Sequence, residues 1–250
     1  MRQKIPSFVL AWAGLTPAWA HAQDILAVGT EFSFIFEKST AGQYHGYAVD
    51  LLTKLAQKSG HTLRFEILPW LRAQWMVEQG QAQILIGPYK SAQRQDKFEY
   101  AQRALFRDQI VFYVRKDSGM GWNGDYRRLQ NSRVAVIQGW VYGDAFEQAR
   151  ALIKPAIASN LSSAINLLET RRVDYLASNK RDTEGWLRQS GQKQILSLEP
   201  AIDRQDAYLA YCKQKVCSEL RQQFDQIYQQ MWHKQEIQKI AKAYPINLPD

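Results

Sequence analysis

Short apolar runs alternate along the chain with longer segments in which apolar positions recur every three or four residues. The first pattern predicts buried strands and the second predicts amphipathic helices. In the first half, strands are expected at residues 25–29, 62–68, 84–86 and 109–115, and helices at residues 50–60 and 70–78. Strands that alternate with helices at this spacing favour α/β units and a largely parallel sheet.

The same pattern starts again after a glycine-containing break at residues 118–121. Strands are expected at residues 133–137, 173–177 and 207–212. Helices are expected at residues 144–152, 183–189 and 220–232. Another helix is expected after an N-cap at Ser162, and a last helical run extends through Ile240. Because the halves repeat one order of elements, two α/β lobes are favoured over one sheet. Lobe 1 is expected to comprise residues 23–112 and 207–250, and lobe 2 residues 113–206. Connections between them are expected around residues 109–117 and 204–212.

The first 22 residues have the pattern of a secretory signal peptide. Arg2 and Lys4 precede an apolar stretch at residues 8–15, and small residues permit cleavage after Ala20 or Ala22. A membrane anchor is the less favoured alternative, because a spanning helix needs roughly 20 apolar residues. The mature chain is therefore expected to be soluble and exported, in the periplasm.

The formal net charge is +8, but lysine and arginine are scattered rather than grouped. No basic-aromatic RNA-binding motif or helix-turn-helix signature is present, so a nucleic-acid partner is not expected. Cys212 and Cys217 are the two cysteines, and in an oxidising compartment they favour a disulfide between a strand end and the next helix. Metal binding is the alternative, but the four histidines do not cluster near the cysteines. Neither a metal nor a cofactor is expected.

A polar turn at residues 87–101, GPYKSAQRQDKFEYA, carries Arg94 after an apolar run. A guanidinium offers a rigid fork of donors that matches a carboxylate. Arg94 is thus a candidate for binding an anionic group at the mouth of a cleft. A solvated arginine on a loop is the alternative interpretation.

An ordered series of segments gives this turn a context: VGTE, GYAVDLL, PW, SAQR, FYVRKDS, RVAVIQG and RRVDYLAS. In this order they resemble the family 3 extracytoplasmic solute-binding proteins, the polar-amino-acid-binding subunits of bacterial ABC importers. The resemblance covers essentially the whole mature chain. It implies the periplasmic-binding-protein type II architecture, in which two α/β lobes joined by two hinge strands close on a small ligand. It also implies a monomer that has an ABC permease as partner and is not an enzyme.

The resemblance assigns ligand contacts to individual positions. Arg94 takes the carboxylate, Phe34 stacks on the ligand, and Glu31 is placed to contact a cationic group. The other ligand-contact candidates in the cleft are Trp70, Gly87, Tyr89, Trp140 and Asn179. Ordinary core packing remains the alternative for the aromatic candidates, a surface carboxylate for Glu31, and a helix cap for Asn179.

Four positions depart from the family pattern. Val141 stands where a hydroxyl usually helps to hold the carboxylate, next to an unexpected Trp140. Asn179 stands where an acidic residue usually takes the α-amino group, and Ala48 replaces another aspartate. An amide accepts hydrogen bonds from an ammonium but does not neutralise its charge. An acidic or neutral ligand, a modified amino acid, or a ligand held by aromatic stacking is therefore compatible with the sequence.

The function expected from the sequence is periplasmic binding of a small polar solute, an amino acid or related carboxylate, for delivery to an ABC importer. One alternative is a periplasmic cyclohexadienyl-type dehydratase, an enzyme whose fold resembles that of the binding proteins. The other is a sensory or orphan binding protein without a permease.

Overall fold

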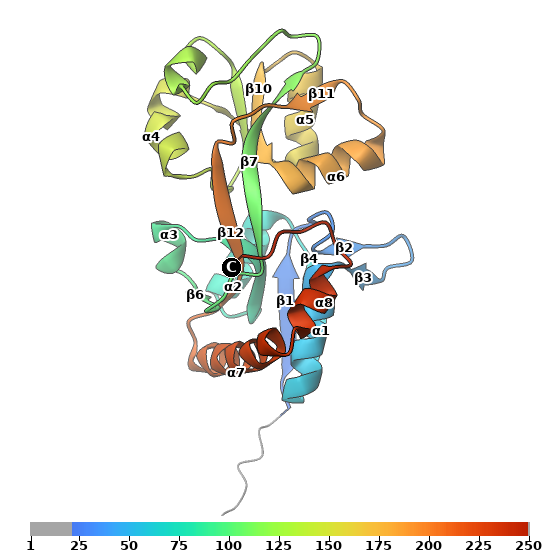
Figure 1. Cartoon of the computed structure of the whole chain (residues 1–250). Coiled ribbons are helices and arrows are strands. Elements are labelled where there is room, and N and C mark those ends of the chain that lie inside the picture. Colours follow the sequence, from blue (N-terminus) through green and yellow to red (C-terminus); the bar gives the residue numbers. More distant parts are fainter. Residues whose placement is uncertain (1–21, 250) are drawn as a thin grey trace, which may run out of the picture.

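The computed structural model describes residues 22–249, so most of the expected signal peptide lies outside the described residues. Two long strands run between two lobes, β7 (Phe106–Arg115) and β12 (Asp203–Tyr211) (Figure 1). We call the part that contains the first strand lobe 1 and the other part lobe 2. None of the described helices combines the length and apolar character needed to cross a membrane.

Lobe 1 is formed by both ends of the described chain. Its elements are β1 (Asp24–Gly29), the hairpin of β2 (Glu37–Lys38) and β3 (Tyr44–His45), α1 (Tyr47–Ser59), β4 (Thr62–Ile67), α2 (Trp70–Glu78), β5 (Ile84–Tyr89), α3 (Ala92–Gln95), β6 (Glu99–Tyr100), α7 (Lys215–His233) and α8 (Glu236–Ala241). The last two helices pack on α1, so they return to lobe 1 as expected. Helix α1 ends before Gly60, whose φ of 76° is a left-handed conformation that glycine adopts at little cost.

Lobe 2 contains η1 (Tyr126–Leu129), β8 (Val134–Ile137), α4 (Asp144–Ile153), β9 (Ala156–Ala158), α5 (Leu161–Glu169), β10 (Tyr175–Asn179), α6 (Lys180–Ser190) and β11 (Ile195–Ser197). The N-cap expected at Ser162 is wrong. Asn160 has the extended backbone of a cap, and its side-chain oxygen accepts the Ser163 N–H at 2.8 Å. Helix α5 therefore starts one residue before Ser162.

Apart from the β2–β3 hairpin, the strands of both lobes belong to one hydrogen-bonded sheet, with the main order β4-β1-β5-β12-β7-β10-β8-β9. Pairing is parallel within each lobe, for β1 with β4 and β5 and for β8 with β9 and β10. It is antiparallel at β7 and β12, where residues 106–110 face residues 203–207. The expectation of two lobes agrees with this arrangement. The expectation of separate sheets does not, because the two hinge strands also pair with each other.

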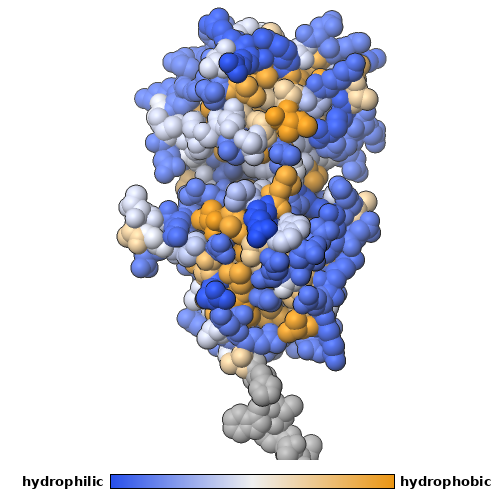
Figure 2. Space-filling view, turned by 180° about the vertical axis from the view of Figure 1, so that it is seen from behind, coloured by the Kyte–Doolittle hydropathy of each residue, from blue (hydrophilic) through white to orange (hydrophobic). Residues whose placement is uncertain are grey.

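Each lobe has its own apolar core. In lobe 1 a single core fills the space between the sheet and its helices, whereas lobe 2 has separate buried clusters that include alternate residues of β7. Alternation is expected when both faces of a strand are covered. The Cys212–Cys217 disulfide is present and joins the end of β12 to α7, as predicted. Hydrophilic residues cover most of both lobes, and apolar residues reach the surface in patches on each lobe as well as near the boundary between them (Figure 2).

Candidate functional site between the lobes

Arg94 follows β5, whose pairing with β12 has an irregularity between Ile86 and Tyr89. Gly87 has a φ of 79°, and a side chain there would be strained in this left-handed conformation. The chain then enters the short helix α3, whose N-cap Ser91 accepts the backbone N–H of Arg94. Arg94 is only 6% exposed. The polar turn expected around this residue is thus a short capped helix that buries the guanidinium.

The Arg94 guanidinium bonds to backbone carbonyls of both lobes. Its Nη1 donates to the Tyr89 carbonyl at 2.9 Å, and its Nη2 donates to the Gly139 carbonyl of lobe 2 at 2.6 Å. The Trp70 indole N–H also donates to the Gly139 carbonyl, at 3.0 Å, and the guanidinium lies over the Trp70 ring. Burial lowers the pKa of Arg94. Within residues 22–249 no carboxylate pairs with this guanidinium, so its charge is held by dipoles and an aromatic face alone.

A small cavity of about 20 Å³ adjoins Arg94, and we call it the inner cavity. It is lined by Phe32, Trp70, Gly87, Tyr89, Arg94, Trp140 and Val141. Phe32 packs edge-on against Trp70, with ring centroids 5.8 Å apart, and lies 6.3 Å from the Trp140 ring. Five sequence candidates, Trp70, Gly87, Tyr89, Arg94 and Trp140, therefore meet here. Phe32 was missed by the sequence reasoning.

Phe34 lies elsewhere. Its backbone is left-handed, with a φ of 67°, and its ring faces the Arg188 guanidinium rather than Arg94. Phe32, rather than Phe34, lines the inner cavity together with Arg94. Two aromatics separated by one residue are equivalent in a sequence pattern, and only the path of the loop after β1 decides which one enters the inner cavity.

A larger chamber of about 510 Å³, which we call the outer chamber, opens beside the inner cavity and shares Trp70 and Trp140 with it. Glu31 is found here rather than next to Arg94. The chamber is lined by Thr30, Glu31, Ser33, Glu37, Ile67, Leu68, Pro69, Trp70, Ile137, Trp140, Ser159, Asn160, Leu161, Ser162, Asp182, Trp186 and Gln189. Three of these described residues are acidic, three are tryptophans, and none is lysine, arginine or histidine. The chamber is therefore acidic and aromatic.

Asn179 belongs to a buried set of polar groups around Asp108 that we call the hinge network. The Asn179 side-chain oxygen caps α6 by accepting the Asp182 N–H at 2.9 Å, and its amide nitrogen donates to Tyr89 and Asp108. Tyr89 donates its hydroxyl to Asp108 at 2.9 Å. The helix cap weighed for Asn179 from the sequence is therefore present, and its contact with a ligand stays a prediction. Burial, followed by the charge of Asp108, raises the pKa of Tyr89 well above its usual value.

Arg181 completes the hinge network. Its Nε and Nη2 donate to the two carboxylate oxygens of Asp108, both at 3.0 Å, and the two side chains are 10% and 2% exposed. Its Nη1 donates across the cleft to the Ser33 carbonyl. Asp108 therefore accepts from three side chains, one of lobe 1 and two of lobe 2.

Ser33 forms a further direct contact between the lobes. Its backbone N–H donates to the Asp182 carboxylate at 2.8 Å, and its hydroxyl donates to the Asp182 carbonyl at 3.3 Å. Helix α6 approaches so closely that a Cβ on Gly185 would lie 2.5 Å from the Cβ of Ser33. Burial raises the pKa of the Asp182 carboxyl, although Arg181 opposes this shift.

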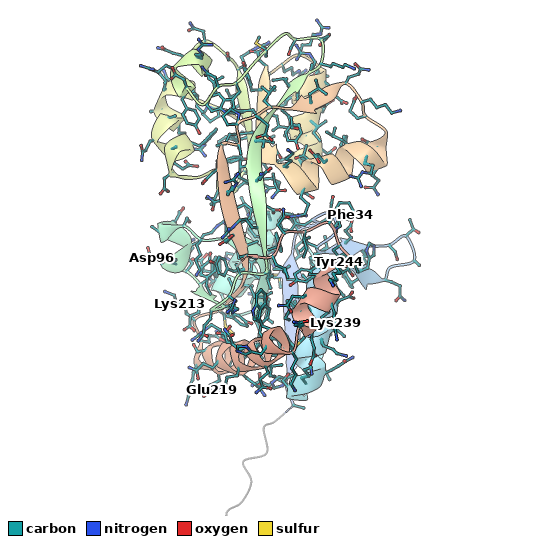
Figure 3. All side chains as sticks on the ribbon, in the orientation of Figure 1. Phe34, Asp96, Lys213, Glu219, Lys239 and Tyr244 are labelled. Carbon is teal, nitrogen blue, oxygen red and sulfur yellow. A yellow bond between two sulfur atoms is a disulfide. The ribbon has the colours of Figure 1, made fainter. Side chains whose placement is uncertain are left out.

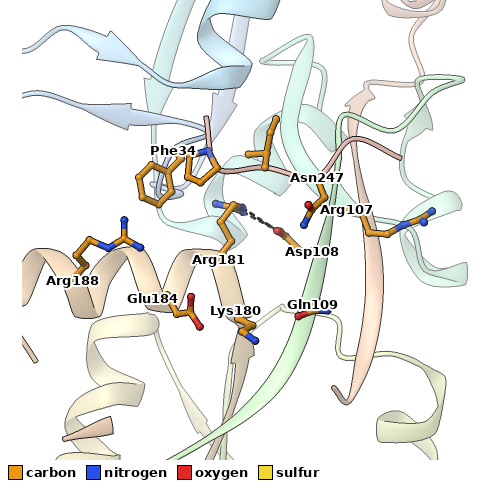
Figure 4. A pocket seen from close by; sticks show the side chains of 11 residues that line it. Phe34, Arg107, Asp108, Gln109, Lys180, Arg181, Glu184, Arg188 and Asn247 are labelled. Atoms are coloured by element: carbon orange, nitrogen blue, oxygen red, sulfur yellow. Dashed lines mark hydrogen bonds and ion pairs between the residues drawn. The ribbon is translucent and has the colours of Figure 1, made fainter. Parts of the chain in front are cut away.

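On the side of the hinge network away from Arg94 lies a cavity of about 250 Å³, which we call the rear cavity (Figure 4). It is lined by Phe34, Arg107, Asp108, Gln109, Lys180, Arg181, Glu184, Arg188, Pro245, Ile246 and Asn247. Figure 3 shows Phe34 at the boundary between the lobes. The C-terminal segment closes this side, because the Arg107 N–H donates to the Asn247 carbonyl at 2.8 Å. Across the described part of the chain, no group of three or more His, Cys, Asp or Glu residues is arranged to hold a metal.

The fold and this cleft define a two-lobed α/β binding protein. A model of the bacterial extracellular solute-binding proteins, family 3, matches residues 26–246, and the chain belongs to that family. A search among curated proteins finds no significant match.

Solved structures with the same fold share little sequence with this chain. A histidine kinase sensor domain with similarity to periplasmic binding proteins is 15% identical and has a TM-score of 0.82, with 92% of this chain and 99% of that chain covered. The substrate-binding protein of an amino acid ABC transporter is 16% identical, with a TM-score of 0.75 and coverage of 90% and 99%. A substrate-binding protein of an ABC uptake transporter from Streptococcus pneumoniae, with bound histidine, is 15% identical, with a TM-score of 0.76 and coverage of 89% and 92%. These likenesses confirm the periplasmic-binding-protein fold.

Proposed function

We propose that this protein binds a small carboxylate solute, an amino acid or a related acid, between its lobes, and that Arg94 contacts the carboxylate. The observation that carries this proposal is the buried charge of Arg94, which no described carboxylate neutralises. A buried charge without a counter-charge is costly, and sites that bind ions are where proteins retain such groups. Trp70 and Phe32 from lobe 1 and Trp140 from lobe 2 surround the same cavity.

Binding is coupled to opening and closing about β7 and β12. The Gly139 carbonyl holds one N–H of Arg94, and separation of the lobes frees that N–H for a carboxylate. A carboxylate forms stronger, charge-assisted hydrogen bonds with a guanidinium than a carbonyl does. Because only contacts that differ between open and closed forms shift their populations, a solute that bonds to both lobes stabilises its own enclosure.

A thermal-shift screen with amino acids, dicarboxylates and short peptides tests the binding role, because a ligand of the folded state raises the melting temperature. Wild-type protein is expected to respond to at least one carboxylate, and Arg94→Gln is expected to lose that response. Arg188→Gln is the matched control, since Arg188 also lies over an aromatic ring but on the far side of the hinge network. An Arg94→Gln protein that responds as the wild type does would refute the assigned role.

In this proposal the protein is exported to the periplasm and delivers its solute to an ABC permease. The support is family membership and the fold shared with the substrate-binding protein of an amino acid ABC transporter. Deletion of the gene is then expected to abolish uptake of the solute by cells. The sensory alternative is favoured by one observation, the TM-score of 0.82 with a histidine kinase sensor domain. Unchanged uptake combined with a lost transcriptional response to the solute would favour sensing.

We further propose that the cleft binds without catalysis. General acid–base chemistry needs an ionisable group whose pKa lies near the working pH. The inner cavity offers Arg94 and Tyr89, and burial moves the pKa of Tyr89 further from neutrality. In the outer chamber burial raises the pKa of Asp182, but its carboxylate is engaged by the Ser33 N–H. Incubation with prephenate or arogenate is expected to yield no product, and turnover of either would establish the dehydratase alternative.

A further inference from the structure

The inner cavity is suited to only one kind of charged group. Arg94 is the only Lys, Arg, His, Asp or Glu residue among its described lining residues, and the other walls are aromatic, aliphatic or backbone. Gly139 and Tyr89 already supply the carbonyls that the guanidinium uses. An anionic group fits here, whereas a cationic group would meet a like charge in a poorly solvated space.

Among the described residues, no unpaired carboxylate lies next to Arg94 that could accept a hydrogen bond from an α-ammonium group of the solute. The Asn179 oxygen is used to cap α6, and its amide nitrogen is turned towards Asp108 and Tyr89. Asp108 is neutralised by Arg181 through two hydrogen bonds and accepts from Tyr89 as well. An ammonium on the carbon beside the carboxylate would therefore be buried without a counter-charge, which is costly.

The outer chamber has the opposite character. It adjoins the inner cavity through the shared walls of Trp70 and Trp140, and Trp186 adds a third indole. Glu31 is an exposed carboxylate on its lining, and no basic described residue lines it. Indole faces attract cations, and a volume of about 510 Å³ accommodates an extended organic cation rather than a single ion.

From this polarity we propose that the solute is an acid with its cationic group at the far end: an ω-amino or ω-guanidino carboxylic acid without an α-amino group. Its carboxylate bonds to Arg94, its carbon chain passes between Trp70 and Trp140, and its cation lies against Trp186 and near Glu31. This inference rests on the proposed function and narrows its substrate class.

Calorimetric titrations with five defined compounds test the proposal: 5-aminopentanoate, 4-guanidinobutanoate, pentanoate, lysine and arginine. The two ω-cationic acids are expected to bind roughly tenfold more tightly than pentanoate, from contact of the cation with indole faces and a carboxylate. Lysine and arginine are expected to bind roughly tenfold more weakly than the ω-cationic acids, because their α-ammonium group lacks an acceptor. Glu31→Gln is expected to reduce the advantage of the ω-cationic acids and to leave pentanoate unchanged. Glu184→Gln, on the rear cavity, is the matched control.

The outcomes separate the two proposals. If lysine or arginine binds more tightly than the ω-cationic acids, or if pentanoate equals them, the substrate class is wrong and carboxylate binding at Arg94 stands. If binding is found but Arg94→Gln leaves every affinity unchanged, the proposed function itself fails. The same conclusion follows if none of these compounds, and no acid in the thermal-shift screen, binds to the wild type.

Discussion

Two arginines are buried at the boundary between the lobes, and their surroundings differ. Arg181 of lobe 2 forms a two-point ion pair with Asp108 inside the hinge network, which Tyr89 and Asn179 complete. Arg94 of lobe 1 has no such partner in the described chain and bonds to two backbone carbonyls. Both guanidiniums reach across the cleft, to Ser33 and to Gly139 respectively.

The difference separates a structural arginine, Arg181, from Arg94, the arginine that we propose binds the solute. A buried ion pair that is fully hydrogen-bonded has no need of another ion, and its geometry can fix how two parts of a protein meet. A buried guanidinium held only by dipoles retains most of its capacity for an anion. Burial alone does not distinguish the two, whereas the presence or absence of a carboxylate does.

The largest effect is expected when the hinge network is broken. Asp108→Asn removes the carboxylate that Arg181 bonds at two points, and loss of one partner of such a buried pair costs about 3–5 kcal/mol. The free energy of unfolding, measured with urea, is expected to fall by this amount. Asp206→Asn is the control, because Asp206 pairs with Arg107 on the surface. Equal losses of unfolding free energy in Asp108→Asn and Asp206→Asn would contradict the structural role of the buried pair of Asp108 and Arg181.

Arg94→Gln is expected to act on binding rather than stability. Loss of one side of a buried, hydrogen-bonded charge pair costs about 3 kcal/mol of affinity, or roughly a hundredfold, at the lower end of measured values. Its unfolding free energy is expected to change by less than about 1 kcal/mol, since relief from an unpaired buried charge offsets the lost hydrogen bonds. A stability loss as large as that of Asp108→Asn would place Arg94 with the structural arginine.

Gly185→Ala is expected to hold the lobes apart. The added Cβ would overlap Ser33, and overpacking of this kind costs about 1–3 kcal/mol. Alanine favours a helix over glycine by roughly 1 kcal/mol, so α6 itself is not weakened. Small-angle X-ray scattering is expected to show a larger radius of gyration for Gly185→Ala than for the wild type. Gly121→Ala, where a Cβ meets no atom within 4 Å, provides the control and is expected to keep the wild-type value.

The smallest effect concerns Asp182. Its pKa is raised by burial, so the folded protein binds its proton more tightly than the unfolded chain does. This carboxyl therefore lowers stability as the pH rises from the usual aspartate pKa through the raised one. Asp182→Asn keeps an oxygen for the Ser33 N–H and is expected to flatten the stability profile in that window. If Asp182→Asn keeps the wild-type dependence of stability on pH, groups other than Asp182 cause that dependence.

Much of the fold follows from local patterns. Helix α2 and the expected segment at residues 70–78 coincide, and the disulfide joins the two cysteines for which it was predicted. The pairing of β7 with β12 was not predictable, because strand partners distant in sequence are chosen by the packing of whole lobes. Strand β12 also begins four residues earlier than expected, at the polar residue Asp203, since hinge pairing rather than apolar burial defines its start.

The sequence by itself determined the positions of most helices and strands, and its ordered segments indicated the class of protein through their resemblance to a family. It also predicted Arg94 as the residue that contacts a carboxylate. The helices and strands depend on periodicity, which is a local property. Only the tertiary structure placed Phe32 instead of Phe34 beside Arg94, turned Asn179 towards Asp108, and supplied Arg181 as the partner of that aspartate. Which charges are neutralised inside a cleft depends on groups far apart in the chain, and a local pattern carries no information about their distances.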